Sequence, residues 1–257
     1  MSRFVALMYH GLKDAPTGNY SISFKAFNAQ LRWLKDEGYV VEGLPELEHR
    51  LEQNDFPQRY AVMTFDDGHK SDLRAAEMLR KQDAQATFFI VRDYSQNEKG
   101  FLNENEIREL SNLCSVGSHG ITHAPISRMS LSEMQFELSE SKKWLENVVG
   151  RRVDMFSAPG GFISSSVVRQ ARSLGYSLCG SSVEWSNEPG RVMDSRVVDR
   201  IAIRRSFLMP AFKKAVRGDL TFLLQRRLRS HLLSIPKRLL SSGQMDSLKQ
   251  IFHGTRT

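Results

Sequence analysis

The chain has 257 residues and a formal net charge of +7, with 40% hydrophobic and 25% charged residues. These ordinary globular values exclude a mainly disordered chain, and the length is that of a single α/β barrel with a short extension. The two cysteines exclude a disulfide-rich secreted scaffold, and no stretch approaches the roughly 18 apolar residues that a transmembrane helix needs.

Short apolar runs alternate with amphipathic segments over most of the chain. In chain order, periodicity predicts strands at residues 4–9, 39–41, 61–65, 86–91, 116–118, 155–157, 176–180 and 200–203. Helices are predicted from residue 23 onward and over residues 71–82, 104–114, 130–149 and 166–174. Ser130 and Glu133 form the capping-box pattern at the start of the longest helix. This alternation predicts a parallel β/α architecture.

Two short motifs carry side chains suited to metal chemistry. Asp66 and Asp67 end the apolar run at residues 61–65, and His119 and His123 follow the strand predicted at residues 116–118. One carboxylate and two imidazoles can fill three corners of a tetrahedral zinc site and leave the fourth for water. The second carboxylate is then free to take a proton from that water.

Each motif also has a purely structural interpretation. Asp-Asp-Gly after a strand is a common turn, because Asp caps its own backbone and Gly accepts positive φ. Two histidines four positions apart are often exposed neighbours on a helix. Taken together, the motifs offer ligands suited to zinc at predicted loop positions, which favours a metal site.

These motifs resemble those of a known family. Residues 64–68, Thr-Phe-Asp-Asp-Gly, and residues 118–123, Ser-His-Gly-Ile-Thr-His, are similar to the first two signature motifs of the polysaccharide deacetylases. Residues 156–161, Phe-Ser-Ala-Pro-Gly-Gly, resemble the third motif more weakly. The resemblance spans roughly residues 4–205, the size of an ordinary domain. It implies an α/β fold, a distorted, incomplete parallel (β/α) barrel of about seven strands.

The resemblance also implies an activity and a cofactor. The chain would be a metal-dependent hydrolase that removes N-acetyl groups from N-acetylated sugars of a bacterial polysaccharide or its precursor. The divalent metal would be Zn²⁺, with Co²⁺ and Ni²⁺ as alternatives, because these ions occupy similar nitrogen and oxygen sites.

Residue roles follow from the same resemblance. Asp67, His119 and His123 would hold the metal and Asp66 would be the general base. Pro159, Gly160 and Gly161 would bind substrate, and a backbone N–H of this segment would stabilise the oxyanion.

The sequence departs from the family pattern at two places. Ser157 stands where the third motif usually has the arginine that orients the base, so the base must be held in another way. Residues 201–205 contain arginines but lack the histidine acid of the family's late Leu-x-His segment. His10 ends the first predicted strand and is our candidate proton donor, since catalytic groups gather at the carboxyl ends of barrel strands. A structural role for His10 is the alternative.

These departures keep two other functions open. The first is a related hydrolase that cleaves another C–N bond, such as that of a cyclic amide, because a different leaving group would need different acid chemistry. The second is a catalytically impaired domain that binds metal and glycan. Ammonia or a ring-opened product would mark the first, and metal binding without turnover would mark the second.

The basic charge is concentrated in the last part of the chain. Residues 199–257 hold 13 Lys and Arg against three Asp and Glu, a net charge of +10. We therefore expect a catalytic domain over residues 1–210 and a basic amphipathic extension over residues 211–257. Residues 218–240 are predicted either to contact an anionic membrane or to pack on the barrel. Nucleic acid binding is not expected, because no nucleic-acid motif is present.

The apolar run near the amino terminus bears on location. Residues 4–9 are shorter than the core of a signal peptide and no small-residue cleavage site follows them. We therefore expect a cytoplasmic protein, peripheral to the inner membrane if the basic extension binds it.

Overall fold

The computed structural model describes residues 3–227. The chain divides into two compact units, Met1–Gly218 and Asp219–Thr257. In the second unit, residues 220–227 are helical. The rest of the predicted extension, residues 228–257, lies outside the described residues. None of the helices within residues 3–227 has the length and apolar composition that spanning a bilayer requires.

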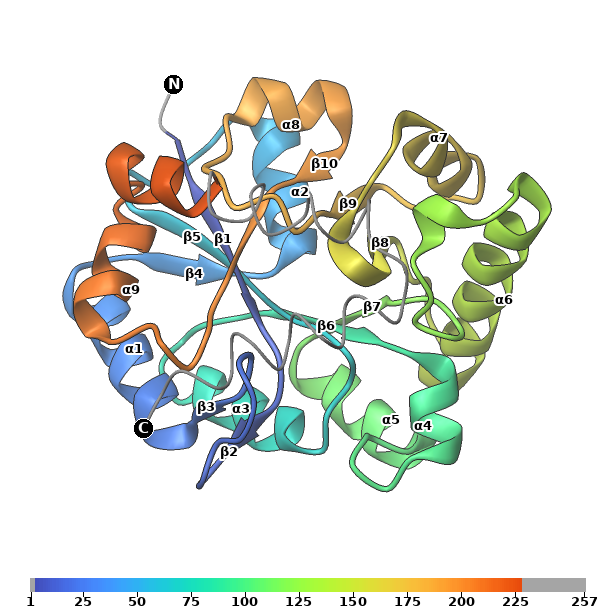
Figure 1. The fold of residues 1–257 in the computed structure, drawn as a ribbon, viewed down its shortest axis with the longest axis horizontal. Helices are drawn as coiled ribbons and strands as arrows, with labels where there is room; N and C mark the ends of the chain where they lie inside the picture. The colour runs from blue at the N-terminus through green and yellow to red at the C-terminus, as the bar shows by residue number, and fades with distance from the viewer. Residues whose placement is uncertain (1–2, 228–257) are drawn as a thin grey trace, which may run out of the picture. The chain divides into compact units, whose positions relative to one another are not determined.

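The first unit is built on a parallel sheet of nine strands, in the order β10-β9-β8-β7-β6-β5-β1-β11 with β4 paired to β5 (Figure 1). The strands of this sheet are β1 (Val5–Tyr9), β4 (Val40–Glu42), β5 (Tyr60–Phe65), β6 (Thr87–Ile90), β7 (Ser115–Ser118), β8 (Met155–Ser157), β9 (Leu178–Gly180), β10 (Val197–Val198) and β11 (Arg200–Ala202). A separate two-stranded sheet contains β2 (Leu12–Lys13) and β3 (Ile22–Ser23).

The two ends of the sheet are joined by a single residue. β10 pairs with β9 and β11 pairs with β1, and only Asp199 separates β10 from β11 in the chain. The sheet therefore curls into a nearly closed barrel, which confirms the predicted fold class. The eight predicted strand ranges all correspond to strands of this sheet, and β10 was missed because a two-residue strand leaves no periodic pattern in the sequence.

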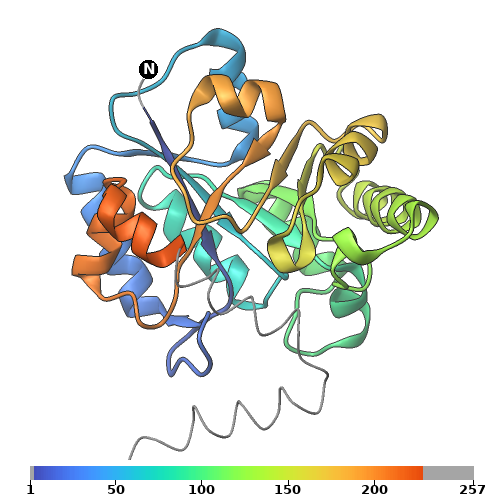
Figure 2. The ribbon, with the colours of Figure 1, turned by 45° about the horizontal axis from the view of Figure 1, so that its top comes forward.

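The helices connect successive strands and lie mainly around the outside of the sheet (Figures 1 and 2). They are α1 (Phe24–Asp36), α2 (Leu44–Gln53), α3 (Ser71–Arg80), α4 (Arg92–Asn97), α5 (Glu104–Leu113), α6 (Leu131–Val149), α7 (Ser165–Ser173), α8 (Pro189–Ser195) and α9 (Met209–Val216), with short 3₁₀ turns η1 (Ile126–Arg128) and η2 (Pro159–Gly161). The predicted capping box at α6 is confirmed: the Ser130 Oγ accepts from the Glu133 N–H and the Glu133 carboxylate accepts from the Ser130 N–H.

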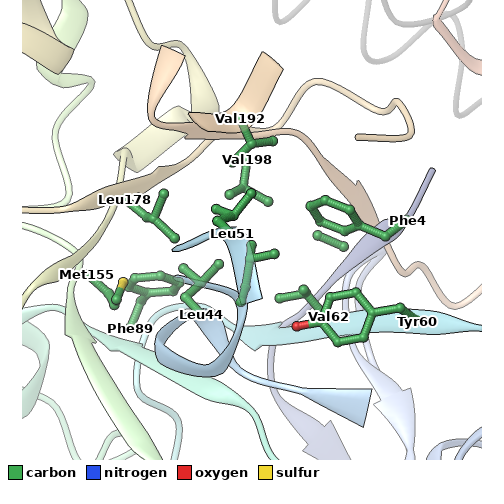
Figure 3. Packing of buried hydrophobic residues seen from close by; sticks show 12 residues of the cluster. Phe4, Leu44, Leu51, Tyr60, Val62, Phe89, Met155, Leu178, Val192 and Val198 are labelled. Carbon is green, nitrogen blue, oxygen red and sulfur yellow. The ribbon is translucent and has the colours of Figure 1, made fainter. Parts of the chain in front are cut away.

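A buried apolar cluster fills the sheet near the amino ends of its strands (Figure 3). It combines side chains from the strands, such as Phe4, Tyr60 and Leu178, with Leu44 and Leu51 of α2. The polar side chains discussed below lie at the opposite, carboxyl ends of the strands. The barrel thus separates a packed apolar base from a polar rim, as in other parallel β/α barrels.

The two cysteines are free and buried. Burial raises the pKa of the Cys114 thiol to about 11 and that of the Cys179 thiol to about 12. Both therefore behave as small core residues.

Candidate active site

Strand ends bring the two predicted motifs together. Asp66 directly follows β5, and its N–H donates to the Tyr9 carbonyl oxygen at 2.9 Å, which continues the pairing of β5 with β1. His119 directly follows β7, and its N–H donates to the Ile90 carbonyl oxygen at 2.8 Å. Because the strands are parallel, their carboxyl ends share one rim, and both side chains reach the same polar centre.

Asp67, His119 and His123 form a candidate metal site. One ligand atom from each of the three lies within 4.8 Å of the others. The Asp67 Oδ1 is 3.3 Å from the His123 Nε2 and 3.6 Å from the His119 Nε2. Donor atoms bound tetrahedrally to zinc at about 2.0–2.1 Å would be separated by about 3.4 Å. The two distances from the Asp67 Oδ1 therefore match the spacing of ligands around one ion.

Two further observations support this fit. The Asp67 Oδ1 is buried and has no hydrogen-bond partner within residues 3–227, although a buried carboxylate oxygen normally has one. The His119 Nδ1 lies 2.7 Å from the Ser157 carbonyl oxygen, a contact that requires the proton on Nδ1. The His119 Nε2 is then unprotonated and available as a ligand, in the arrangement typical of metal-bound histidine.

The backbone of the site is held in unusual conformations. Asp67 has φ 83° and His123 has φ 60°, in the left-handed region that non-glycine residues rarely adopt. The loop between the two histidines is fixed by Glu137 of α6, which accepts from the Ile121 N–H at 2.6 Å and the Thr122 hydroxyl at 2.6 Å. Such conformations persist where surrounding contacts impose them, and they cluster at functional sites.

Asp66 is held by Arg200, a residue that the sequence analysis did not select. The Arg200 Nη1 donates to the Asp66 Oδ1 at 2.7 Å and the Arg200 Nη2 donates to the Asp66 Oδ2 at 2.9 Å. Ser157 also contacts this carboxylate, with its Oγ 3.2 Å from the Asp66 Oδ2. The partner missing from the third motif is therefore supplied by β11.

Every N–H of the buried Arg200 guanidinium has an acceptor. Besides Asp66, these are the Ser181 carbonyl oxygen at 2.9 Å, the Thr64 Oγ1 at 3.1 Å and the Ser157 Oγ at 2.7 Å. The absence of a side chain at Gly180 makes room for the guanidinium, since a Cβ there would lie 2.8 Å from the Arg200 Nε. A guanidinium has five N–H donors in a fixed plane, so this environment locks Arg200 in one orientation.

The charges of the site set its protonation states. Burial alone would raise the pKa of the Asp66 carboxyl, but the Arg200 guanidinium and the His119 imidazole hold it below its ordinary value. Burial is likewise outweighed at Asp67, where His69 and the other nearby imidazoles hold the pKa below its usual range. Burial lowers the pKa of His119 despite the two carboxylates. At neutral pH the site thus holds two carboxylates and a neutral His119.

His10 lies beside the site, at the end of β1. Its Nδ1 is buried and has no hydrogen-bond partner within the described part of the chain, and its ring lies 4.9 Å from that of Tyr20. Burial lowers the pKa of His10, while the Asp66 and Asp67 carboxylates act in the opposite direction. Its imidazole is therefore neutral at rest.

The segment Pro159, Gly160 and Gly161 forms the turn η2 next to the histidine loop. A Cβ on Gly120 would lie 3.6 Å from the Pro159 Cγ, which places the turn against that loop. The Gly161 N–H donates to the Ala158 carbonyl oxygen at 2.8 Å. A Cβ on Gly161 would lie 2.0 Å from the Ser182 Oγ, so only glycine fits there.

His69 is a second site residue that the sequence analysis did not select. Its Nε2 lies 3.5 Å from the Asp67 Oδ2, whereas the Asp67 Oδ1 faces His119 and His123. The sequence could have indicated this residue, because it directly follows the Asp-Asp-Gly motif.

The chain is similar in sequence to known proteins. Residues 53–179 match the family model described as polysaccharide deacetylase. A putative polysaccharide deacetylase of Bacillus subtilis, YxkH, is 29% identical over 215 residues, which cover 82% of this chain and 74% of that protein. A chitooligosaccharide deacetylase of Azorhizobium caulinodans is 28% identical over 148 residues, which cover 54% of this chain and 63% of that protein.

A peptidoglycan-N-acetylglucosamine deacetylase of Bacillus cereus is 26% identical over 155 residues, which cover 60% of this chain. The matched region spans 64% of that protein, so the chain covers less than two thirds of the Bacillus cereus and Azorhizobium relatives.

Solved structures show the same fold. A polysaccharide deacetylase from Bacillus cereus superposes with a TM-score of 0.72 at 26% identity, covering 84% of this chain and 69% of that one. A Streptococcus pyogenes deacetylase in complex with acetate superposes with a TM-score of 0.75 at 22% identity, covering 83% of this chain and 98% of that one.

Proposed function

Because residues 53–179 match the polysaccharide deacetylase family, we propose that the chain is a metal-dependent hydrolase that removes N-acetyl groups from the sugars of a bacterial polysaccharide or its precursor. The observation that carries the proposal is that the candidate metal site and the Asp66 carboxylate lie side by side at the carboxyl ends of the strands. Asp67, His119 and His123 converge on one point, and the His119 Nε2 lies only 3.8 Å from the Oδ2 of Asp66, the carboxylate held by Arg200.

Asp67, His119 and His123 are the proposed ligands of a divalent cation, with zinc as the first choice and cobalt and nickel as alternatives. A bound cation of this kind would supply a water of lowered pKa and polarise the acetyl carbonyl oxygen. The neutral state of His119 and the unpartnered Asp67 Oδ1 support this assignment, since a ligand must offer a lone pair.

Asp66 is the proposed general base. Its carboxyl stays ionised because Arg200 lowers its pKa, so it can accept a proton when water attacks the acetyl carbon. The two hydrogen bonds from Arg200 fix the plane of this carboxylate. Arg200 thus orients the base and keeps it charged. The third motif cannot do this, because it has Ser157 in place of the usual arginine.

The Gly160 N–H is our proposal for the backbone donor that stabilises the oxyanion. Pro159 has no N–H, and the Gly161 N–H already donates to the Ala158 carbonyl oxygen. Gly160 has φ 71°, a conformation that glycine adopts without strain. Within the predicted segment, Gly160 therefore retains an N–H for substrate.

His10 remains the proposed proton donor to the leaving amine. The unpartnered, buried Nδ1 offers a position for a transferred proton. Because the imidazole is neutral at rest, it must first take up the proton that Asp66 accepts from the attacking water and then pass it to the amine. Asp66 is the alternative donor, since it holds the proton taken from water.

The basic extension and the cellular location are also proposals. Leu220 and Leu224 are 51% and 49% exposed on the helix at residues 220–227, and their spacing places them on one face. This supports contact of residues 218–240 with an anionic membrane, where a lipid-linked sugar precursor would be encountered from the cytoplasmic side.

The function is tested by incubating the protein, loaded with zinc, with N-acetylated glucosamine oligosaccharides and measuring acetate. We expect acetate release that stops on chelation and returns with the metal. Release of ammonia or a ring-opened product from cyclic amides would favour the related C–N hydrolase. Tight metal and glycan binding without any turnover would indicate a binding domain.

A further inference from the structure

The two oxygens of Asp67 have different neighbours. Oδ1 faces the Nε2 atoms of His119 and His123, at 3.6 and 3.3 Å, while Oδ2 lies 3.5 Å from the Nε2 of His69. Oδ1 has no hydrogen-bond partner within residues 3–227. The carboxylate is therefore divided between one oxygen that faces the candidate metal site and one that faces an imidazole.

His69 is held in place by contacts independent of Asp67. Its ring stacks on Phe101 with centroids 4.7 Å apart and planes 25° apart, and its backbone forms an antiparallel bridge with the same residue. On the other side, a Cβ added to Gly11 would lie 3.1 Å from the His69 Cγ. The imidazole is thus fixed between the segment that follows β1 and the loop before α5.

His69 stands outside the group of converging ligand atoms. That group contains Asp67, His119 and His123, and the His69 Nε2 approaches the outward oxygen of Asp67 instead. Its side chain is 25% exposed, against 16% for Asp67. This is the position of a group that orients a metal ligand without binding the ion.

We infer that His69 is a positioning residue that holds Asp67 as a one-oxygen ligand, by directing an N–H at Oδ2 and leaving Oδ1 for the ion. The inference rests on the metal site of the proposed function. An outer partner of this kind restrains the carboxylate before the metal arrives, and its loss typically weakens metal affinity about 10- to 100-fold.

Two substitutions separate the N–H from the packing of the ring. His69→Phe keeps a flat ring between Phe101 and Gly11 but removes the donor. His69→Gln keeps an N–H donor and loses most of the stacking. Phe101→Leu is the matched control, because it disturbs the stacking and leaves the donor in place.

The zinc dissociation constant of each variant is measured by competition with a chromophoric chelator, and the absorption spectrum of the cobalt form reports the ligand set. We expect the dissociation constant of His69→Phe to rise about 10- to 100-fold. His69→Gln and Phe101→Leu should stay closer to the parent. The energies and intensities of the cobalt bands should be the same in the parent, His69→Gln and Phe101→Leu.

Parent-like affinity in His69→Phe would overturn the inference, and so would an equal loss in Phe101→Leu, which would assign His69 to packing alone. Cobalt bands altered in His69→Gln would also overturn it, because that variant keeps the N–H and a change would mean that the imidazole itself is a ligand. If His69→Phe fails to fold, His69→Leu replaces it as the variant without an N–H, and equal zinc affinity in His69→Leu and His69→Gln would overturn the inference. A parent that binds zinc but releases no acetate would refute the proposed function and leave this result intact.

Discussion

Asp66 and Arg200 are 134 positions apart in the chain, and their side chains form two hydrogen bonds of 2.7 and 2.9 Å inside the barrel. The contact exists because β1 lies between β5 and β11, so the carboxylate after β5 and the guanidinium of β11 reach the same space. Ser157 is small enough to leave that space open and contacts both groups. Arg200 of β11 thus supplies the guanidinium contact to Asp66, the proposed base.

Replacing Arg200 with lysine should weaken catalysis and shift its pH dependence. Lysine cannot donate two parallel hydrogen bonds to one carboxylate. A hydrogen bond to a charged group contributes about 1.5–3 kcal/mol, so kcat/KM should fall about 10- to 100-fold. Because Arg200 lowers the pKa of Asp66, its loss raises that pKa, and the acidic limb of the pH–rate profile should move to higher pH. An unshifted profile would show that Arg200 does not set the charge of Asp66.

Replacing His10 with alanine should reduce turnover strongly and leave the metal content unchanged. His10 is the proposed proton donor and does not belong to the converging ligand group. General acid catalysis contributes about 10²- to 10⁴-fold, which sets the expected loss in kcat. His49→Ala on α2, an exposed histidine outside the site, is the control. If His10→Ala keeps the parent turnover, His10 is not the acid, and Asp66 becomes the proposed proton donor to the leaving amine.

Replacing Asp72 with asparagine should stabilise the metal-free protein at neutral pH. Burial and the nearby Asp67 carboxylate raise the pKa of Asp72 well above its ordinary value. As pH rises above about 3.9, the unfolded chain loses this proton and the folded protein keeps it, so the carboxyl reduces stability. Asparagine removes the penalty.

The free energy of unfolding, measured in urea with chelator present, should exceed that of the parent by about 1–3 kcal/mol at pH 8, and the difference should shrink at pH 5. Asp36→Asn, at an exposed position, is the control and should show no such trend. A gain that is equal at both pH values would argue against a protonated Asp72.

Deleting residues 218–257 should release the protein from vesicles that contain anionic lipid. Each Lys or Arg close to such a surface contributes about 1 kcal/mol, and salt should weaken binding of the parent. Sedimentation with anionic and with neutral vesicles measures the effect. Equal binding before and after deletion would assign the extension to packing.

The proposed metal ligands and the proposed base could be selected from the sequence because each motif is local. Asp66 and Asp67 are adjacent, and His119 and His123 are four positions apart, so strand ends need only bring two short segments together. Arg200 could not be predicted from its own neighbourhood, where it looks like one of several arginines in a basic region. Its contact with Asp66 depends on the order of the strands in the sheet, which a local pattern does not reveal.

Other omissions differ in their cause. Helix α2 was not predicted, although Leu44, Leu47 and Leu51 recur at helical spacing, so its signal was present in the sequence. Strand β10 has two residues and depends on pairing with β9, which no local pattern reveals. Within residues 159–161, backbone hydrogen bonding distinguishes Gly160 from Gly161, and the sequence does not contain that information.

The most direct test of the account is acetate release by the zinc-loaded parent and by Asp66→Asn at equal metal content. The asparagine keeps the size of the base but cannot accept the proton of water, so we expect acetate from the parent and a rate about 10²- to 10⁴-fold lower from the variant. Equal rates from the two proteins, or no acetate from a parent that holds its full zinc complement, would contradict the account.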